Sequence, residues 1–156
     1  MSSASLLQLL ATQARLSDGE LAERLDMTEE AVRAQREQWE KEGVILGYQA
    51  VVNEEYEHDS KVAAFIEVKM TPERDGGFDR LAMRISRFDE VSSCYLASGG
   101  FDLLVLVEAK SLKELALFVS SKLSTLEMVT GTQTSFVLKR YKEAVSYTHL
   151  RAHKTR

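Results

Sequence analysis

The chain has 156 residues, of which 44% are hydrophobic and 28% charged, a balance that is typical of globular proteins. No apolar run approaches the length of about 20 residues that spans a membrane, and the N-terminus lacks the features of a signal peptide. The single cysteine, Cys94, excludes an internal disulfide, and we expect a buried, unreactive thiol in a protein of the reducing cytoplasm.

Charge is distributed unevenly along the chain, whose net charge is −4. Residues 1–60 carry five basic and thirteen acidic groups, whereas residues 61–145 carry twelve basic and eleven acidic groups. A DNA-binding module is expected to be basic, because phosphate neutralisation supplies most of its non-specific affinity. The acidity of the N-terminal part therefore argues against DNA binding by that part.

Three helices are predicted in the N-terminal part, over residues 3–14, 18–25 and 28–43. The first has a broad leucine face, and Leu21, Ala22 and Leu25 recur at helical spacing in the second. We expect Thr28 to cap the third helix and Gly43 to end it. The turn between the last two helices is very short, which is typical of a helix-turn-helix, whose second helix enters a DNA groove.

The next two segments differ in composition. Residues 44–53 are rich in β-branched side chains and are predicted to form a strand, whereas residues 53–60 are polar, acidic and without periodicity. We therefore expect a helix-turn-helix domain over residues 1–52, a linker over residues 53–60 and a second domain over residues 61–145.

The second domain is predicted to alternate strands and helices. Strands are expected over residues 62–70, 91–97, 101–109 and 132–140, and helices over residues 77–88 and after the cap Ser111. The order βαββαβ is that of an α+β ferredoxin-like domain, an antiparallel sheet with both helices on one face. The bare face of such a sheet usually needs a partner, most simply a second copy of the chain.

The end of the chain, residues 146–156, continues no pattern and resembles translated sequencing-adaptor sequence, so we expect it to be non-native. Other chemistry is sparse, because His58 lies in the expected linker and His149 and His153 lie in this tail. No group has metal-ligand spacing, and no other histidine exists for a nucleophile–base pair. We therefore expect no enzyme active site and no metal or other cofactor.

The helix-turn-helix, followed by a βαββαβ domain with a Gly-Gly-x-Asp turn, resembles the Lrp/AsnC (feast/famine) family of transcription regulators over residues 5–143. Each matching piece is weak alone, but the ordered set at these spacings is specific. The matching residues are Leu9-Leu10, Arg15-Leu16-Ser17, Leu21-Ala22, Val32, Trp39-Glu40, Gly43-Val44-Ile45, Gly47-Tyr48, the run 98–104, Thr132-Gln133-Thr134 and Phe136-Val137-Leu138.

The resemblance implies a bacterial or archaeal regulator that dimerises through its C-terminal sheets, in many cases assembles into octamers, and senses amino acids between dimers. The residues matching the effector-contacting turn and the adjacent strand are Ser98, Gly99, Gly100, Asp102, Thr132 and Thr134. Glycines let backbone N–H groups approach a carboxylate, while Asp102 is able to accept from an α-ammonium. The alternative is that the glycines only form a tight hairpin and Asp102 satisfies nearby backbone.

The third helix departs from the family pattern at the positions that commonly aim arginines at DNA, which here hold Gln35 and Gln38. Glu29 and Glu30 stand near the expected phosphates and would oppose binding. The candidate DNA contacts that remain are Thr28, Arg33, Gln35 and Arg36, of which the glutamine is able to read adenine bidentately. The alternative for the arginines is a solvated face with the pairs Arg33–Glu37 and Arg36–Glu40.

Three functions follow from these patterns. The first is a regulator that binds double-stranded DNA and responds to a small amino-acid-like effector. The second is an effector-sensing or protein-interaction module of the same architecture that has lost DNA binding. The third is an enzyme, since the sirohaem decarboxylases share this architecture, but the absence of histidine between residues 59 and 148 disfavours it.

Overall fold

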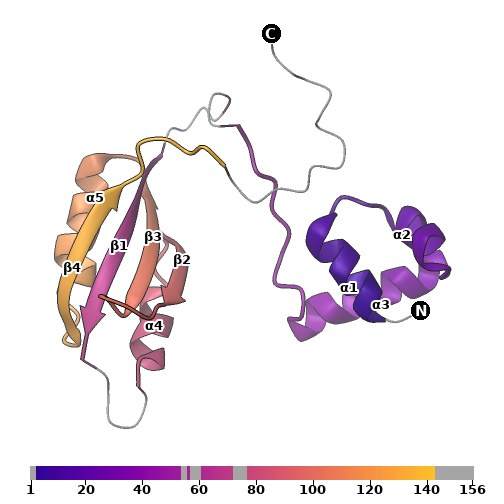
Figure 1. Cartoon of the computed structure of the whole chain (residues 1–156), viewed down its shortest axis with the longest axis horizontal. Helices are drawn as coiled ribbons and strands as arrows, with labels where there is room; N and C mark the ends of the chain where they lie inside the picture. The colour runs from indigo at the N-terminus through magenta and orange to yellow at the C-terminus, as the bar shows by residue number, and fades with distance from the viewer. Residues whose placement is uncertain (1–2, 54–55, 57–60, 72–76, 143–156) are drawn as a thin grey trace. The chain divides into compact units, whose positions relative to one another are not determined.

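The computed structural model describes residues 3–53, 56, 61–71 and 77–142. These residues divide into two compact units, of which the first runs to Val52 and the second covers the described residues from Asn53 to Tyr141 (Figure 1). The expected tail over residues 146–156 and most of the expected linker over residues 53–60 lie outside the described residues.

The first unit contains three helices, and their ends are set by local capping. They are α1 (Ser3–Thr12), α2 (Asp18–Leu25) and α3 (Glu29–Glu42). The Ser17 hydroxyl accepts from the Glu20 amide while the Glu20 carboxylate accepts from the Ser17 amide, which forms a capping box before α2. Gly43 ends α3 with φ at 72°, a left-handed conformation that glycine adopts without steric cost. The bounds predicted for α2 and α3 are confirmed, whereas α1 ends earlier than residue 14.

One apolar cluster holds these helices together. Leu6 and Leu10 of α1, Leu21 of α2, and Val32 and Trp39 of α3 are all buried in it. Val32 and Trp39 lie seven residues apart on one face of α3, so burying them leaves the opposite face of the helix to solvent.

The strand predicted over residues 44–53 is wrong, because these residues form no strand in the structure. Leu46 is 95% exposed, and no described residue pairs with the segment in a sheet. A β-branched composition favours extended backbone, but a strand also needs a neighbour for its N–H and C=O groups. That neighbour is missing from the described part of the chain.

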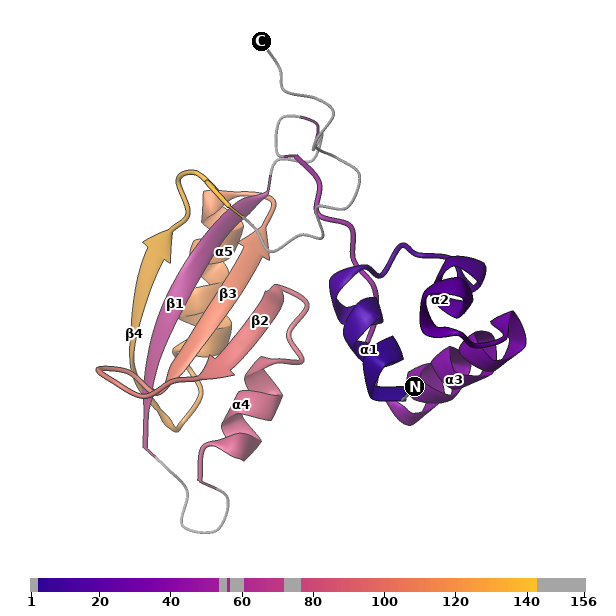
Figure 2. The same cartoon turned by 45° about the vertical axis from the view of Figure 1, so that its right-hand side comes forward.

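The second unit is a four-stranded antiparallel sheet in the order β2-β3-β1-β4. Its strands are β1 (Val62–Met70), β2 (Val91–Leu96), β3 (Leu103–Ala109) and β4 (Val129–Phe136). Helix α4 (Asp79–Ile85), helix α5 (Leu112–Phe118) and its π-helical continuation η2 (Val119–Leu123) complete it. Figures 1 and 2 show α4 and α5 behind the same side of the sheet. The predicted ferredoxin-like α+β fold is confirmed.

Several elements of this unit differ from their predicted bounds. Strand β2 ends one residue before residue 97, and β3 begins two residues after residue 101. Helix α4 is shorter than residues 77–88. Strand β4 begins before residue 132 and ends at Phe136, because its pairing with β1 runs from Met70 to Ala64. Leu138, predicted to continue the alternation, is 95% exposed beyond the last paired residues. The extent of β4 is therefore defined by its pairing with β1 rather than by its own composition.

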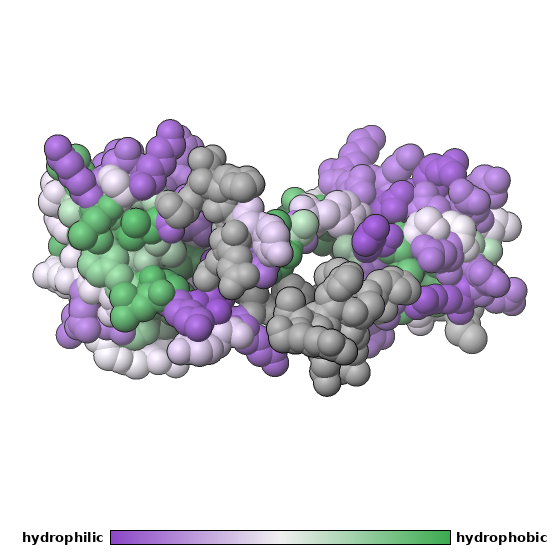
Figure 3. Space-filling view, turned by 90° about the horizontal axis from the view of Figure 1, so that it is seen from above, coloured by the Kyte–Doolittle hydropathy of each residue, from purple (hydrophilic) through white to green (hydrophobic). Residues whose placement is uncertain are grey.

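The two faces of the sheet have different surroundings. Leu103, Val105 and Val107 alternate along β3 and are fully buried beneath the helices. On the other face Phe65 pairs with Leu106 of β3 and is 42% exposed, since no described helix of this unit covers it. Figure 3 shows green, hydrophobic surface gathered on this unit, while the surface of the first unit is mostly purple in that view. The sheet thus keeps one partly apolar face open, as predicted.

Candidate functional site

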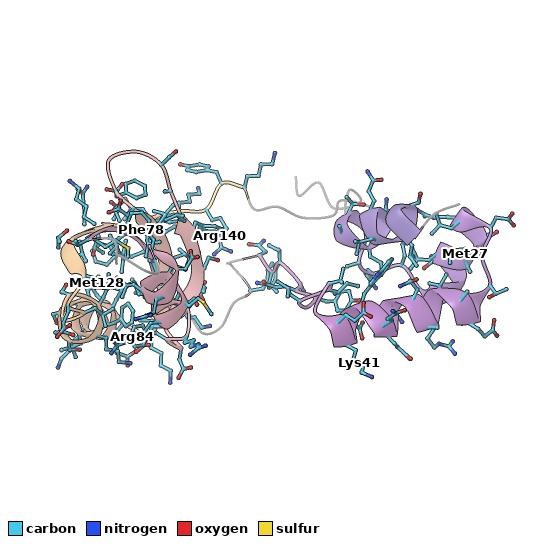
Figure 4. The ribbon with its side chains drawn as sticks, turned by 90° about the horizontal axis from the view of Figure 1, so that it is seen from below. Met27, Lys41, Phe78, Arg84, Met128 and Arg140 are labelled. Carbon is cyan, nitrogen blue, oxygen red and sulfur yellow. The ribbon has the colours of Figure 1, made fainter. Side chains whose placement is uncertain are left out.

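Helix α3 is the candidate DNA-contacting element, and its first turn is fixed by Thr28. The Thr28 hydroxyl oxygen accepts a hydrogen bond from the Ala31 amide at 3.2 Å. Glu29 and Glu30 follow in the same turn, where the helix dipole favours negative charge. Lys41 extends from the last turn of α3 (Figure 4). The side-chain oxygen of Thr28 is thus committed to the helix end.

Arg33 is exposed on the flank of α3, whereas Arg36 lies on the same face as the buried Val32 and Trp39. Both arginines contact the same carboxylate, that of Asp18 at the start of α2. Nη2 of Arg36 lies 2.8 Å from Oδ1 of Asp18, and Nε of Arg33 lies 3.5 Å from Oδ2. The side chain of Asp18 is only 10% exposed, whereas those of Arg33 and Arg36 are 51% and 27% exposed. This cluster of Asp18, Arg33 and Arg36 ties α2 to α3 and partly neutralises both arginines.

The ion pairs predicted within α3 are realised in part. Arg36 does approach Glu40, with 4.0 Å between its Nε and the carboxylate. Arg33 pairs at 3.0 Å with Glu29, one turn before it, instead of with Glu37. Residue spacing alone allows either partner, and Asp18 draws Arg33 toward the N-terminal end of α3. The Asp18 contact was not predicted, since nothing in local spacing links residues in different helices.

The two glutamines of α3 have different environments. The Gln38 side chain donates to the Glu42 carboxylate at 2.9 Å, so it is held along the helix. Gln35 is half-buried, and its side chain makes no hydrogen bond to any described residue. Of the candidate contacts, Gln35 therefore keeps its donor and acceptor groups available.

The candidate effector turn joins β2 to β3 and is anchored to the end of β1. Ser98, Gly99 and Gly100 are exposed, and Gly99 has φ at 149°, a region that favours glycine. The Asp102 amide donates to the Val68 carbonyl, and Oδ2 of Asp102 accepts from the Met70 amide, each at 2.9 Å. Asp102 thus accepts a hydrogen bond from nearby backbone, which is the alternative role considered for it.

Thr132 and Thr134 lie on β4, on the other side of β1 from this turn. Thr132 pairs with Val68 and Thr134 with Ile66, so both threonines belong to the helix-covered face of the sheet. The Thr132 hydroxyl lies 3.5 Å from that of Ser124. Val68 therefore separates Thr132 from Asp102. The turn and Thr132 lie near the end of β1, whereas Thr134 pairs with the middle of that strand.

The remaining chemistry of the described residues is limited. Burial raises the pKa of the Cys94 thiol, which packs against the core and is thus kept in its unreactive form at neutral pH. Among the residues described here, no cluster of histidine, cysteine or carboxylate side chains could hold a metal ion. None of the described helices is long and apolar enough to cross a membrane.

Comparison with known proteins places this geometry in a family. Residues 63–147 match the family model described as the Lrp/AsnC ligand binding domain. The chain is 41% identical over 138 residues to an uncharacterised HTH-type transcriptional regulator, YugG of Bacillus subtilis, which covers 88% of this chain and 83% of that protein. It is 27% identical to the proline dehydrogenase transcriptional activator of Rhizobium radiobacter, over 88% of each chain.

A solved structure agrees with these relatives. The transcriptional regulator NMB0573 of Neisseria meningitidis, crystallised as a complex with L-Met, superposes with a TM-score of 0.66 at 27% identity. The match covers 94% of this chain and 95% of that one, so it includes both the helical unit and the sheet. The chain belongs to the Lrp/AsnC family of transcription regulators.

Proposed function

We propose that the protein binds double-stranded DNA through α3 and that a small amino-acid-like effector modulates this binding. The observation that carries the proposal is the helix pair α2–α3. Val32 and Trp39 are buried, whereas Arg33, on the flank of that buried face, is half exposed to solvent as in a recognition helix. The likeness to HTH-type regulators over most of the chain supports the same assignment.

Binding to DNA requires the two arginines to exchange partners. Arg33 is half exposed, and ion pairs in that setting contribute roughly 0–1 kcal/mol, so phosphates compete readily for its guanidinium. Arg36 is held more firmly, because its partner Asp18 is largely buried. We therefore assign Arg33 and Gln35 as the first contacts, with Thr28 close to the backbone and Arg36 joining when Asp18 releases it.

The effector is proposed to bind at the turn that contains Ser98, Gly99, Gly100 and Asp102. Exposed glycine amides suit a carboxylate, and the second oxygen of Asp102 suits an α-ammonium, since only Oδ2 is used by Met70. Thr132 and Thr134 line the neighbouring strand. The L-Met complex of the Neisseria relative supports an amino acid as the class of ligand.

Coupling between the two functions is proposed to pass through oligomerisation. The open face around Phe65 offers a surface for a second copy of the chain, and a dimer would place two α3 helices on successive half-sites of DNA. An effector shifts such an assembly only by the difference in its affinity for the competing arrangements. Octamers are proposed as a further level of the same assembly.

The test is a DNA titration at several salt concentrations. Purified protein truncated after residue 145 is titrated into a labelled duplex of its own upstream region, at about 50 mM and about 200 mM salt, where phosphate contacts have strongly different affinities. We expect saturable binding that weakens steeply with salt and changes when amino acids are added. Absence of binding at low salt would refute the assignment.

A second candidate function rests on the same ion pairs. If Asp18 and Glu29 hold both arginines permanently, the chain is an effector-sensing or protein-interaction module that does not bind DNA. The acidic composition of residues 1–60 favours this candidate. The titration decides between the two functions, because amino-acid binding without any DNA binding is the result that the second candidate requires.

A further inference from the structure

A pocket that none of the candidate residues lines opens on the helical side of the second unit. Its volume is about 590 Å³, which lies in the range of small-molecule sites, and its walls come from α4, η2 and the segment that leads into β4. Arg84 of α4 and Met128 before β4 both line it and are labelled in Figure 4. Nothing in the proposed regulatory function uses this pocket.

Three cationic side chains line the pocket. Arg80 and Arg84 lie one turn apart on α4, and Lys122 faces them from η2. The Arg84 side chain is exposed and makes no ion pair or hydrogen bond with any described residue. Glu127 is the one acidic side chain among the lining residues, so the pocket carries a surplus of positive charge.

Lys122 is held in position by two kinds of contact. Its ammonium lies 5.8 Å from the centre of the Phe88 ring and forms an ion pair with Glu90. A hydrogen bond from Lys122 lowers the pKa of the Glu90 carboxyl, which favours the charged carboxylate. A lysine ammonium has three N–H donors, so Lys122 keeps donors for a ligand while it pairs with Glu90.

The floor of the pocket is apolar. Leu81 and Leu126 are almost fully buried beneath it, and the half-buried Phe88 and Met128 form its sides. Guanidinium groups bind carboxylate and phosphate oxygens bidentately. A bound oxyanion would contact the cationic side chains, while an apolar body attached to it would cover the floor.

We propose that this pocket binds a small organic anion, with its phosphate or carboxylate group between Arg80, Arg84 and Lys122 and its apolar part on Leu81, Phe88 and Met128. The site is separate from the Gly-Gly turn and from α3. It would therefore let the protein respond to a second class of metabolite, one that is negatively charged and not an amino acid.

The test is isothermal titration calorimetry of the full chain with phenyl phosphate, inorganic phosphate and phenol at constant ionic strength. We expect saturable binding of phenyl phosphate, weaker binding of inorganic phosphate and none of phenol. Arg84→Gln should weaken phenyl phosphate binding by about tenfold, because a charge-assisted bidentate contact is lost. Arg80→Gln should have a similar effect.

Arg87→Gln is the matched control, because Arg87 is exposed near the end of α4 but does not line the pocket. It should bind phenyl phosphate like the unmodified chain, and circular dichroism should show that all variants are folded. The proposal is overturned if the unmodified chain shows no saturable binding, if Arg87→Gln weakens binding as much as Arg84→Gln, or if only Asp102→Asn does so. DNA titration of Arg84→Gln should match that of the unmodified chain, whatever the outcome for the proposed regulatory function.

Discussion

At the scale of single residues, the most consequential feature is that one carboxylate holds both arginines of α3. Asp18 contacts Arg33 and Arg36 from the neighbouring helix and is itself largely buried. The same group that joins α2 to α3 thus competes with DNA phosphates for the guanidinium groups. Affinity for DNA should depend on Asp18 although it lies outside α3.

Replacing Asp18 by asparagine should strengthen DNA binding at about 50 mM salt by roughly fivefold, since it removes a negative charge and frees two cations for phosphates. Fluorescence anisotropy with a labelled duplex measures the affinity, and the dependence on salt should become steeper. Asp26→Asn is the matched control, because Asp26 is exposed and contacts neither arginine. An equal gain for Asp26→Asn would contradict the specific role of Asp18.

Asp102 is predicted to have a structural and a binding role that two substitutions separate. Asp102→Ala removes the acceptor of the Met70 amide and should lower the free energy of unfolding by about 1–2 kcal/mol, as measured with urea. Asp102→Asn keeps an oxygen acceptor but loses the charge, so it should retain stability and bind amino acids more weakly in calorimetry. If Asp102→Asn binds them normally, the carboxylate does not contact the α-ammonium.

At the scale of elements, α3 is both the candidate recognition helix and part of a small helical core. Thr28 caps α3, and Trp39 of the same helix is buried in the core of the first unit. A change in the cap should therefore appear in the free energy of unfolding of that unit. Trp39 is also the one tryptophan of the chain, which makes its fluorescence a reporter of this unit alone.

Thr28→Ala should lower the free energy of unfolding of the first unit by about 1 kcal/mol, because the Ala31 amide loses its acceptor. Thr28→Ser should restore most of this loss, since a serine hydroxyl caps equally well. Urea unfolding followed by Trp39 fluorescence is the measurement. No difference between the alanine and serine variants would show that the cap contributes nothing.

At the scale of the whole molecule, the open face of the sheet is the feature that bears on assembly. Phe65 and its neighbours on β3 are partly apolar, and no described element of the same unit covers them. An assembly built on this face would fix the positions of the effector turns and the α3 helices of two chains. Effector binding would influence DNA binding by favouring one such arrangement over another.

Phe65→Glu should convert dimers into monomers, because the charge would be buried against an apolar partner surface. Light scattering on protein eluted from a size-exclusion column measures the molar mass of the assembly. Leu117→Glu is the control, since Leu117 is 53% exposed on α5, on the helical side of the sheet. A dimer that survives Phe65→Glu but not Leu117→Glu would place the interface on the helices.

The sequence by itself determined the elements whose signals are local. The starts of α2 and α3 follow from N-cap side chains that accept a hydrogen bond from the amide three residues later. Strands β1 and β3 follow from composition and alternation. The interactions that favour these helices and strands are made by residues close together in the sequence, so a short segment already contains them. The βαββαβ order could be predicted for the same reason, whereas the family was predicted from the resemblance of an ordered set of residues to a known pattern.

Only the tertiary structure decided what depends on partners distant in sequence. It joined Asp18 to Arg36, placed Asp102 against Met70, left residues 44–53 without a neighbouring strand among the described residues and ended β4 opposite Ala64, near the start of β1. Pairings of this kind are chosen by the packing of separate elements, because many carboxylates and strands compete for each partner. Which groups of the candidate sites are engaged within the chain, and which face solvent, is therefore known only from the folded protein.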